Sequence, residues 1–168
     1  MGKKKRPLKE TLIIVGEGQA EVAFINHVKS LYGVGNPKVK AKSAGGKGPS
    51  NVIGDAIGTL NCSGCDRVVS LLDTDIEWPK VKVKEAKKRE IILIGSDPCL
   101  EGLLLRILEK RVPPQSIDCK REMHPLLDGR ETDKKSYAQL FSRVTLDSVR
   151  DKIEELDLLI KIISGEVK

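Results

Sequence analysis

Three short runs of apolar residues, each followed by a segment with helical periodicity, constrain the fold of this chain more than any other feature. They are TLIIVG at 11–16, DRVVSLLD at 66–73 and EIILIG at 90–95. Strands with one solvent-exposed face alternate apolar and polar residues, whereas strands covered on both faces consist of continuous apolar runs. We therefore expect an α/β fold, doubly wound and Rossmann-like, with a mainly parallel sheet and helices on both faces.

The segments between these runs predict helices and one further strand. PKVKAKS at 37–43 alternates weakly and is typical of an edge strand. Helical patterns are expected over 20–33, 51–60, 99–112 and the second half of 77–89.

A chain of 168 residues suits one domain with one core. We expect a basic tail at 1–10, the α/β domain at 11–110, and a mostly helical C-terminal extension at 111–168 packed on the same domain. The extension ends in one helical stripe of apolar residues: Leu146, Val149, Ile153, Leu156, Ile160 and Ile163.

Acidic residues follow the expected strands, at the edge of the sheet where doubly wound folds form their sites. Glu17 ends the first strand, Asp73 and Asp75 end the middle one, and Asp97 follows the third. Because side chains alternate along an extended chain, Asp73 and Asp75 should point to one side. Carboxylates without histidine or thiolate favour Mg²⁺ or Mn²⁺. We predict a cation site of Glu17, Asp73 and Asp75, with Asp97 as an additional candidate.

Two further acids stand on the apolar stripe of an expected helix. Glu21 and Glu101 each have apolar residues three, four and seven positions later. The helix macrodipole favours acids in the first turn, which explains their place along the helix but less well their place on the buried stripe. We expect both to belong to the site.

Three motifs together resemble the TOPRIM fold, and in particular its RloB-like and OLD-nuclease-like branch, which is associated with prokaryotic defence loci. They are VGEGQAEVAF at 15–24, VVSLLDTD at 68–75 and GSDPCLEGLLLRIL at 95–108. The resemblance covers roughly residues 11–110.

The resemblance implies that Asp73 and Asp75 hold a metal, that Glu17 is a general acid/base or a metal ligand, and that Glu101 is a further catalytic acid. The chain departs from the family pattern in the third motif. Asp97 stands where the family has Asn, Leu100 replaces Phe, and Gly102-Leu103 replaces a bulky pair with Trp, while Ala20 replaces Thr in the first motif.

The chain carries a net charge of +6, and part of the excess is clustered near the N-terminus and in KVKVKEAKKR at 80–89. Such clusters can follow a phosphate backbone, although a tail and a solvated helix face explain them equally well. Lys47, Lys120 and Lys134 are candidate contacts to the backbone. Two Phe, two Tyr and one Trp do not favour a base-stacking platform.

Cys62 and Cys65 have zinc-knuckle spacing, but no second CxxC accompanies them, so the sequence leaves open whether they bind metal. The longest apolar runs are too short to span a bilayer, and the N-terminal segment does not resemble a signal peptide. We expect a cytoplasmic protein with no membrane partner. The oligomeric state stays open, with a homodimer among the options.

The leading functional hypothesis is a Mg²⁺-dependent phosphodiesterase acting on nucleic acid, DNA or RNA. A non-catalytic TOPRIM-fold module that binds nucleic acid or a partner is the alternative. A phosphoacceptor domain of receiver type ranks lower, because no lysine ends the third strand.

Overall fold

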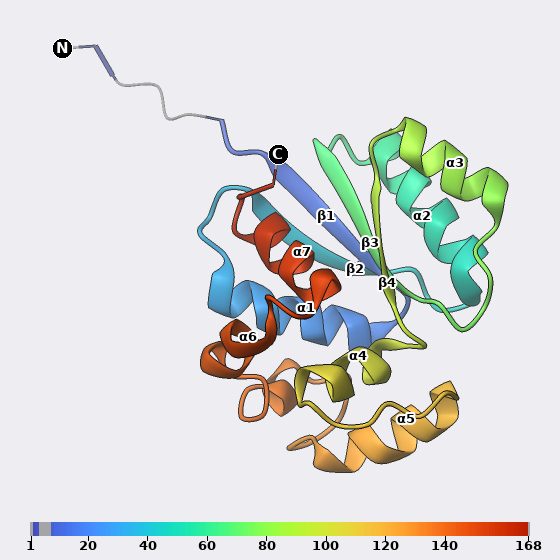
Figure 1. Ribbon diagram of the computed structural model, residues 1–168. Coiled ribbons are helices and arrows are strands. Elements are labelled where there is room, and N and C mark those ends of the chain that lie inside the picture. Colours follow the sequence, from blue (N-terminus) through green and yellow to red (C-terminus); the bar gives the residue numbers. More distant parts are fainter. Residues whose placement is uncertain (1, 4–7, 168) are drawn as a thin grey trace.

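A computed structural model describes residues 2–3 and 8–167 of the chain (Figure 1). Lys4, Lys5 and Arg6 of the expected basic tail lie outside the described residues. The described chain contains a four-stranded, all-parallel sheet in the order β2-β1-β3-β4. The strands are β1 (Thr11–Gly16), β2 (Lys38–Ser43), β3 (Arg67–Asp73) and β4 (Ile92–Ser96).

Helices connect the strands and follow the last one. They are α1 (Gln19–Tyr32), α2 (Gly48–Cys62), α3 (Lys80–Lys88), α4 (Leu100–Ile107), α5 (Ser116–Met123), η1 (His124–Leu126), η2 (Lys134–Tyr137), α6 (Arg143–Val149) and α7 (Glu154–Ile163). The helices among the described residues are not long and apolar enough to cross a membrane.

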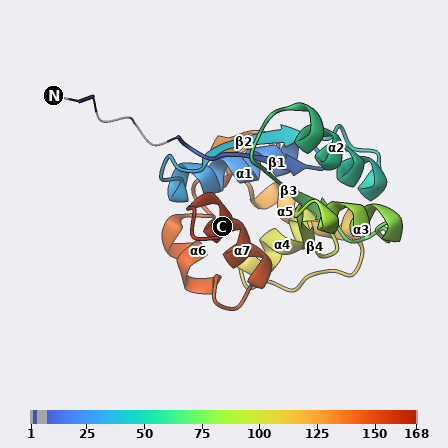
Figure 2. The same ribbon diagram turned by 90° about the horizontal axis from the view of Figure 1, so that it is seen from above.

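The sheet is covered on both faces, which confirms the predicted α/β, doubly wound class. Helices α2 and α3 cover one face over a smaller core that includes Val52, Ile53 and Leu72. Helices α1, α4 and α7 lie on the other face over a larger core that includes Phe24 and Leu104. Seen from above, α2 and α3 lie at one side of the molecule and α6 and α7 at the other (Figure 2).

The C-terminal residues complete the larger core. Met123, Tyr137 and Phe141 are fully buried there, and the rings of Tyr137 and Phe141 pack around Phe24 of α1. These buried side chains hold the segment that follows α4 against α1, and they thereby fix the position of α5.

The single helix expected at the C-terminus is two helices. The chain breaks between α6 and α7 because Ile153 is extended at the start of α7, with its N–H bonded to the carbonyl of Val149. The expected stripe is nevertheless buried throughout, since both helices turn their apolar residues into the same core. Apolar periodicity located the buried residues but could not locate the break.

Gly16 ends β1 at a point where the chain turns closely onto the first turn of α1. A Cβ added at Gly16 would lie 2.5 Å from the Cβ of Glu21. Only glycine therefore permits the approach that brings Glu21 to the carboxyl edge of the sheet.

Replacing Gly16 with alanine should lower the free energy of unfolding by about 1–3 kcal/mol, because the new methyl group forces β1 and α1 apart. Chemical denaturation measures this change. Gly58→Ala is the matched control, because a Cβ at Gly58 meets nothing within 4 Å inside α2. That substitution should stabilise by up to about 1 kcal/mol through helix propensity. Equal effects at the two positions would contradict the close approach at Gly16.

Candidate functional site

The candidate site lies where the order of the strands reverses. The chain passes from β1 outward to β2, then returns to the other side of β1 to form β3. Helices then leave the two central strands toward opposite faces, which opens a crevice beyond their carboxyl ends. Glu17 directly follows β1, and Asp73 is the last residue of β3. The backbone N–H of Asp73 donates to Oε2 of Glu17 at 3.2 Å, so the two residues meet across this point.

A pocket of about 250 Å³ at this point is lined by five acidic residues: Glu131 of the C-terminal region and four from the strand ends and helix starts around it. Glu17 and Asp73 reach it from the ends of β1 and β3, Glu21 from the first turn of α1, and Glu101 from the first turn of α4. Glu21 is 8% exposed and Glu101 is 4% exposed. Carboxylates this buried require a partner or a proton.

Each of the four carboxylates accepts one hydrogen bond that orients it. Leu100 N–H donates to Oδ1 of Asp73 at 3.1 Å, and Gly18 N–H donates to Oε2 of Glu21 at 2.9 Å. Glu101 Oε1 lies 2.8 Å from Nε2 of His124. Among the described residues, no group donates to the second oxygen of any of these carboxylates. The fold thus fixes each carboxylate by one oxygen and leaves the other available to a ligand.

The crowding of these acids changes their protonation. The pKa of Asp73 is raised to about 8, first by burial and then by the charges of its acidic neighbours Glu17, Glu21, Asp75 and Glu101. Burial also raises the pKa of Glu21, against the opposing effect of its backbone hydrogen bonds. At neutral pH the pocket therefore holds less negative charge than its four carboxylates would carry in water.

Two basic side chains reach the pocket from α5 and the turn that follows it. Partial burial lowers the pKa of Lys120, but the carboxylates of Glu101 and Asp73 outweigh it, so the pKa of Lys120 is raised. His124 lines the pocket beside Glu101. The sequence predicted Lys120 as a phosphate contact and did not assign His124. Lys120 and His124 are four residues apart, which places them on the same side of a helix. The sequence would have shown this only if 116–124 had been recognised as helical.

The structure does not bring Asp75 or Asp97 into this pocket. Asp75 is exposed and accepts a hydrogen bond from Ser116 Oγ at 2.7 Å, while Asp97 is exposed and accepts one from Thr74 Oγ1 at 2.9 Å. The alternation expected for Asp73 and Asp75 ends with β3 at Asp73. Beyond it the chain turns, and the N–H groups of Thr74 and Asp75 both bond to the carbonyl of Pro98.

The two other predicted lysines also lie outside the pocket lining. Lys47 is exposed in a left-handed conformation at the start of α2, next to Gly46, which does line the pocket. Lys134 is exposed in η2. Glu131 and Thr132 line the pocket instead, and no sequence pattern singled them out.

The pocket offers carboxylate oxygens, and one oxygen of each carboxylate accepts no hydrogen bond from the described residues. Such ligands suit a hard divalent cation. Within the part of the chain that the structure describes, however, no group of three or more His, Cys, Asp or Glu side chains is arranged to hold a metal ion. Mg²⁺ commonly takes only one or two carboxylates and keeps several waters. The residues present fit such a partly hydrated ion.

The two cysteines of the CxxC motif lie away from this pocket. Cys62 ends α2 and is exposed, and Cys65 accepts a hydrogen bond from Ser63 Oγ in the following turn. Neither joins a metal-binding group among residues 8–167.

Comparison with known proteins adds one relative. The chain is similar to an uncharacterized protein of Aquifex aeolicus (strain VF5), with 26% identity over 157 residues that span 93% of this chain and 90% of that protein. The similarity therefore includes both the sheet and the C-terminal helices. No family model matches the chain. No solved structure matches it.

The raised pKa of Asp73 predicts a pH-dependent effect on stability. The pKa of Asp73 in the folded protein, about 8, lies above its ordinary value of 3.8. The folded state therefore binds this proton more tightly than the unfolded state, and stability falls as pH rises from about 4 to about 8. Asp73→Asn removes this penalty and keeps an acceptor for Leu100 N–H.

We expect Asp73→Asn to raise the free energy of unfolding by about 2 kcal/mol at pH 8 and by almost nothing at pH 4, with denaturation measured in EDTA. Solvent contact in the pocket screens the carboxyl group and keeps the gain below the full linkage value. Asp75→Asn, which changes an exposed carboxylate, should leave stability within about 0.5 kcal/mol at both pH values. A gain at Asp73 that does not depend on pH would contradict the assigned cause.

Proposed function

We propose that this protein is a phosphodiesterase that uses a divalent cation, Mg²⁺ or Mn²⁺, to cleave nucleic acid at the pocket between β1 and β3. The observation that carries the proposal is the convergence of Glu17, Glu21, Asp73 and Glu101 on one pocket that also receives Lys120. A phosphodiester needs positive charge to stabilise its transition state, and a cation held by carboxylates supplies it.

The roles of the side chains follow from their positions. Asp73 and Glu17 meet across the reversal of strand order, so they are the proposed cation ligands. Glu21 bonds to Gly18 N–H at the start of α1, which gives it a structural role as a helix cap as well. Lys120 stands at the rim, where its ammonium group would hold a phosphate oxygen.

Glu101 and His124 form the pair best placed to move a proton. His124 Nε2 lies 2.8 Å from Glu101 Oε1, and the His124 side chain is one-third exposed while the carboxyl of Glu101 is buried. A buried carboxylate that orients a more exposed imidazole is the usual arrangement of an acid–base pair. In the proposal, His124 exchanges a proton with water or with the leaving oxygen, and Glu101 positions its ring.

Three considerations support nucleic acid as the substrate. The chain is basic overall, with a net charge of +6. The order of the Glu-Gly, Asp-x-Asp and third motifs resembles TOPRIM proteins, whose members include nucleases of the OLD type. The strand ends that carry those motifs meet at one edge of the sheet. In this proposal the DxD motif contributes Asp73, and Asp75 serves to bind Ser116 of α5.

Cation binding and cleavage should depend on Asp73 and not on Asp75. With Mg²⁺ or Mn²⁺ present, the wild-type protein should show a raised melting temperature and should cleave labelled DNA or RNA. Asp73→Asn should lose both, with cleavage reduced at least 100-fold, because its neutral amide is a poor ligand for Mg²⁺. Asp75→Asn has the same change of charge two residues away and should keep both.

The outcomes of this experiment separate the hypotheses. Cleavage that persists in Asp73→Asn would contradict the proposed site. Loss of cleavage in Asp75→Asn would restore the two-aspartate site that the sequence suggested. Binding of nucleic acid without turnover in the wild-type protein, measured by filter binding with each metal, would favour the non-catalytic alternative.

Replacing Lys120 should weaken cleavage more than replacing Lys134. Lys120→Gln removes the positive charge at the pocket rim, and we expect about a tenfold loss of cleavage rate, whereas Lys134→Gln should change it less than twofold. Steady-state cleavage assays of both variants test this difference. Equal losses in the two variants would indicate a diffuse contribution of net charge instead of a phosphate contact in the pocket.

A further inference from the structure

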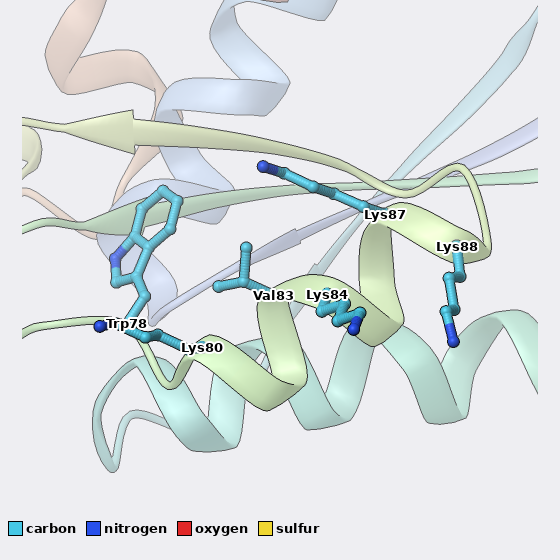
Figure 3. A pocket seen from close by; sticks show the side chains of 6 residues that line it. All are labelled: Trp78, Lys80, Val83, Lys84, Lys87 and Lys88. Atoms are coloured by element: carbon cyan, nitrogen blue, oxygen red, sulfur yellow. The ribbon is translucent and has the colours of Figure 1, made fainter.

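A second hollow, of about 630 Å³, lies on the side of the sheet that α2 and α3 cover, whereas the carboxylate pocket lies beyond the carboxyl ends of the strands. Helix α3 and the segment just before it form its lining, which consists of Trp78, Lys80, Val83, Lys84, Lys87 and Lys88 (Figure 3). Trp78 stands at one end and Lys88 at the other, with Val83 between them. The proposed phosphodiesterase site uses none of these residues.

The four lysines of the hollow follow one face of α3. Lys80, Lys84 and Lys88 are spaced by four residues, and Lys87 falls on the same face. Like charges at this spacing destabilise a helix. All four are exposed, and within the described chain none of them forms an ion pair or a side-chain hydrogen bond. The neighbouring acid, Glu85, pairs with Arg89 instead.

Trp78 is held in a fixed orientation at the end of the hollow nearest the carboxylate pocket. Its indole N–H donates to the carbonyl of Asp73 at 2.8 Å. Its ring also packs against Gly95 of β4, where an added Cβ would lie 3.2 Å from two ring atoms. The ring is only partly buried, so part of it remains available in the hollow. Asp73 therefore has two contacts: its side chain lines the carboxylate pocket, and its backbone carbonyl holds the ring of Trp78.

We propose that this hollow binds a single strand of nucleic acid, with phosphates on the lysines of α3 and one base against the ring of Trp78. The proposal deepens the proposed function, on which it rests for the class of substrate. A strand seated here would cross the carboxyl edge of the sheet beside Asp73 to reach the pocket. One tryptophan offers a contact for one base and not a platform, in agreement with the small number of aromatic residues.

The dimensions and chemistry of the hollow favour a nucleic-acid strand. The nine residues of α3 span about 13 Å, a length over which a nucleic-acid strand presents more than one phosphate at regular spacing. A flat aromatic face combined with unpaired lysines matches a polymer that alternates bases with phosphates. An acidic peptide offers no equally regular partner for the indole ring, and a duplex keeps its bases stacked away from it.

The test uses the full chain in EDTA, so that binding is measured without cleavage. Trp78 is the one tryptophan of the chain, so its intrinsic fluorescence reports on this hollow alone. We expect single-stranded oligo-dT to quench that fluorescence and to bind in a fluorescence anisotropy titration. The double substitution Lys84→Gln with Lys88→Gln should weaken binding about tenfold and reduce the slope of log K against log salt by about 1.4, or about 0.7 per lysine.

Lys38→Gln with Lys40→Gln is the matched control. It removes the same charge from exposed positions of β2, at the other edge of the sheet. The control should keep the affinity and the quenching of the wild-type protein. Equal weakening in both double variants would overturn the proposal, as would binding of oligo-dT without quenching.

Probes of other chemistry complete the test. Duplex DNA should bind more weakly and without quenching, and polyglutamate and phosphatidylserine vesicles should not compete at equal charge concentration. Effective competition by either would assign the hollow to a different polyanion. The result is independent of cleavage at the carboxylate pocket, because EDTA removes the divalent cation that the proposed cleavage requires. If strand binding survives while the wild-type protein shows no cleavage with Mg²⁺ or Mn²⁺, the phosphodiesterase proposal fails and the hollow remains.

Discussion

The repulsion among four carboxylates in one pocket is the interaction on which the rest of the site depends. In an unfolded chain these carboxylates would be solvated and far apart. The fold instead holds Glu21 and Glu101 in the first turns of two helices and Asp73 at the end of a central strand. Each is fixed by a single hydrogen bond, and the pKa of Asp73 rises to about 8 as a result of burial and of its acidic neighbours. Such a cluster adds no stability to the fold, and carboxylates with pKa values shifted in this way are typical of functional sites.

The segment after α4 is part of this site and not an appendage to it. Lys120 and His124 belong to α5 and the turn that follows, and they reach the pocket because the buried side chains of Tyr137 and Phe141 tie the segment to α1. Asp75 contributes to the same attachment through its hydrogen bond with Ser116. The sheet and the helices α1 and α4 therefore supply the four central acids, whereas the C-terminal region supplies Lys120 and His124.

The sequence predicted the fold class well because continuous apolar runs and helical stripes are direct consequences of burial on both faces. It also placed Glu17 and Asp73 at one edge, since the ends of parallel strands must meet there, and Glu21 and Glu101 on buried helix faces. It could not place Asp75, because its direction depends on the residue at which β3 ends. It could not find His124, whose link to Glu101 spans 23 residues and arises from tertiary packing. The break between α6 and α7 was equally hidden, because both helices bury the same periodic residues.

The protonation of Asp73 has a consequence for how the pocket responds to its surroundings. The pKa of this carboxyl is raised to about 8, which favours its protonated form at neutral pH. Under the proposed function, a cation that binds Asp73 would therefore have to displace a proton from the end of β3. Acidification and depletion of divalent cations would then act on this edge of the sheet in the same direction. The apparent affinity for the cation would rise by about tenfold per pH unit in the range where the exchange takes place.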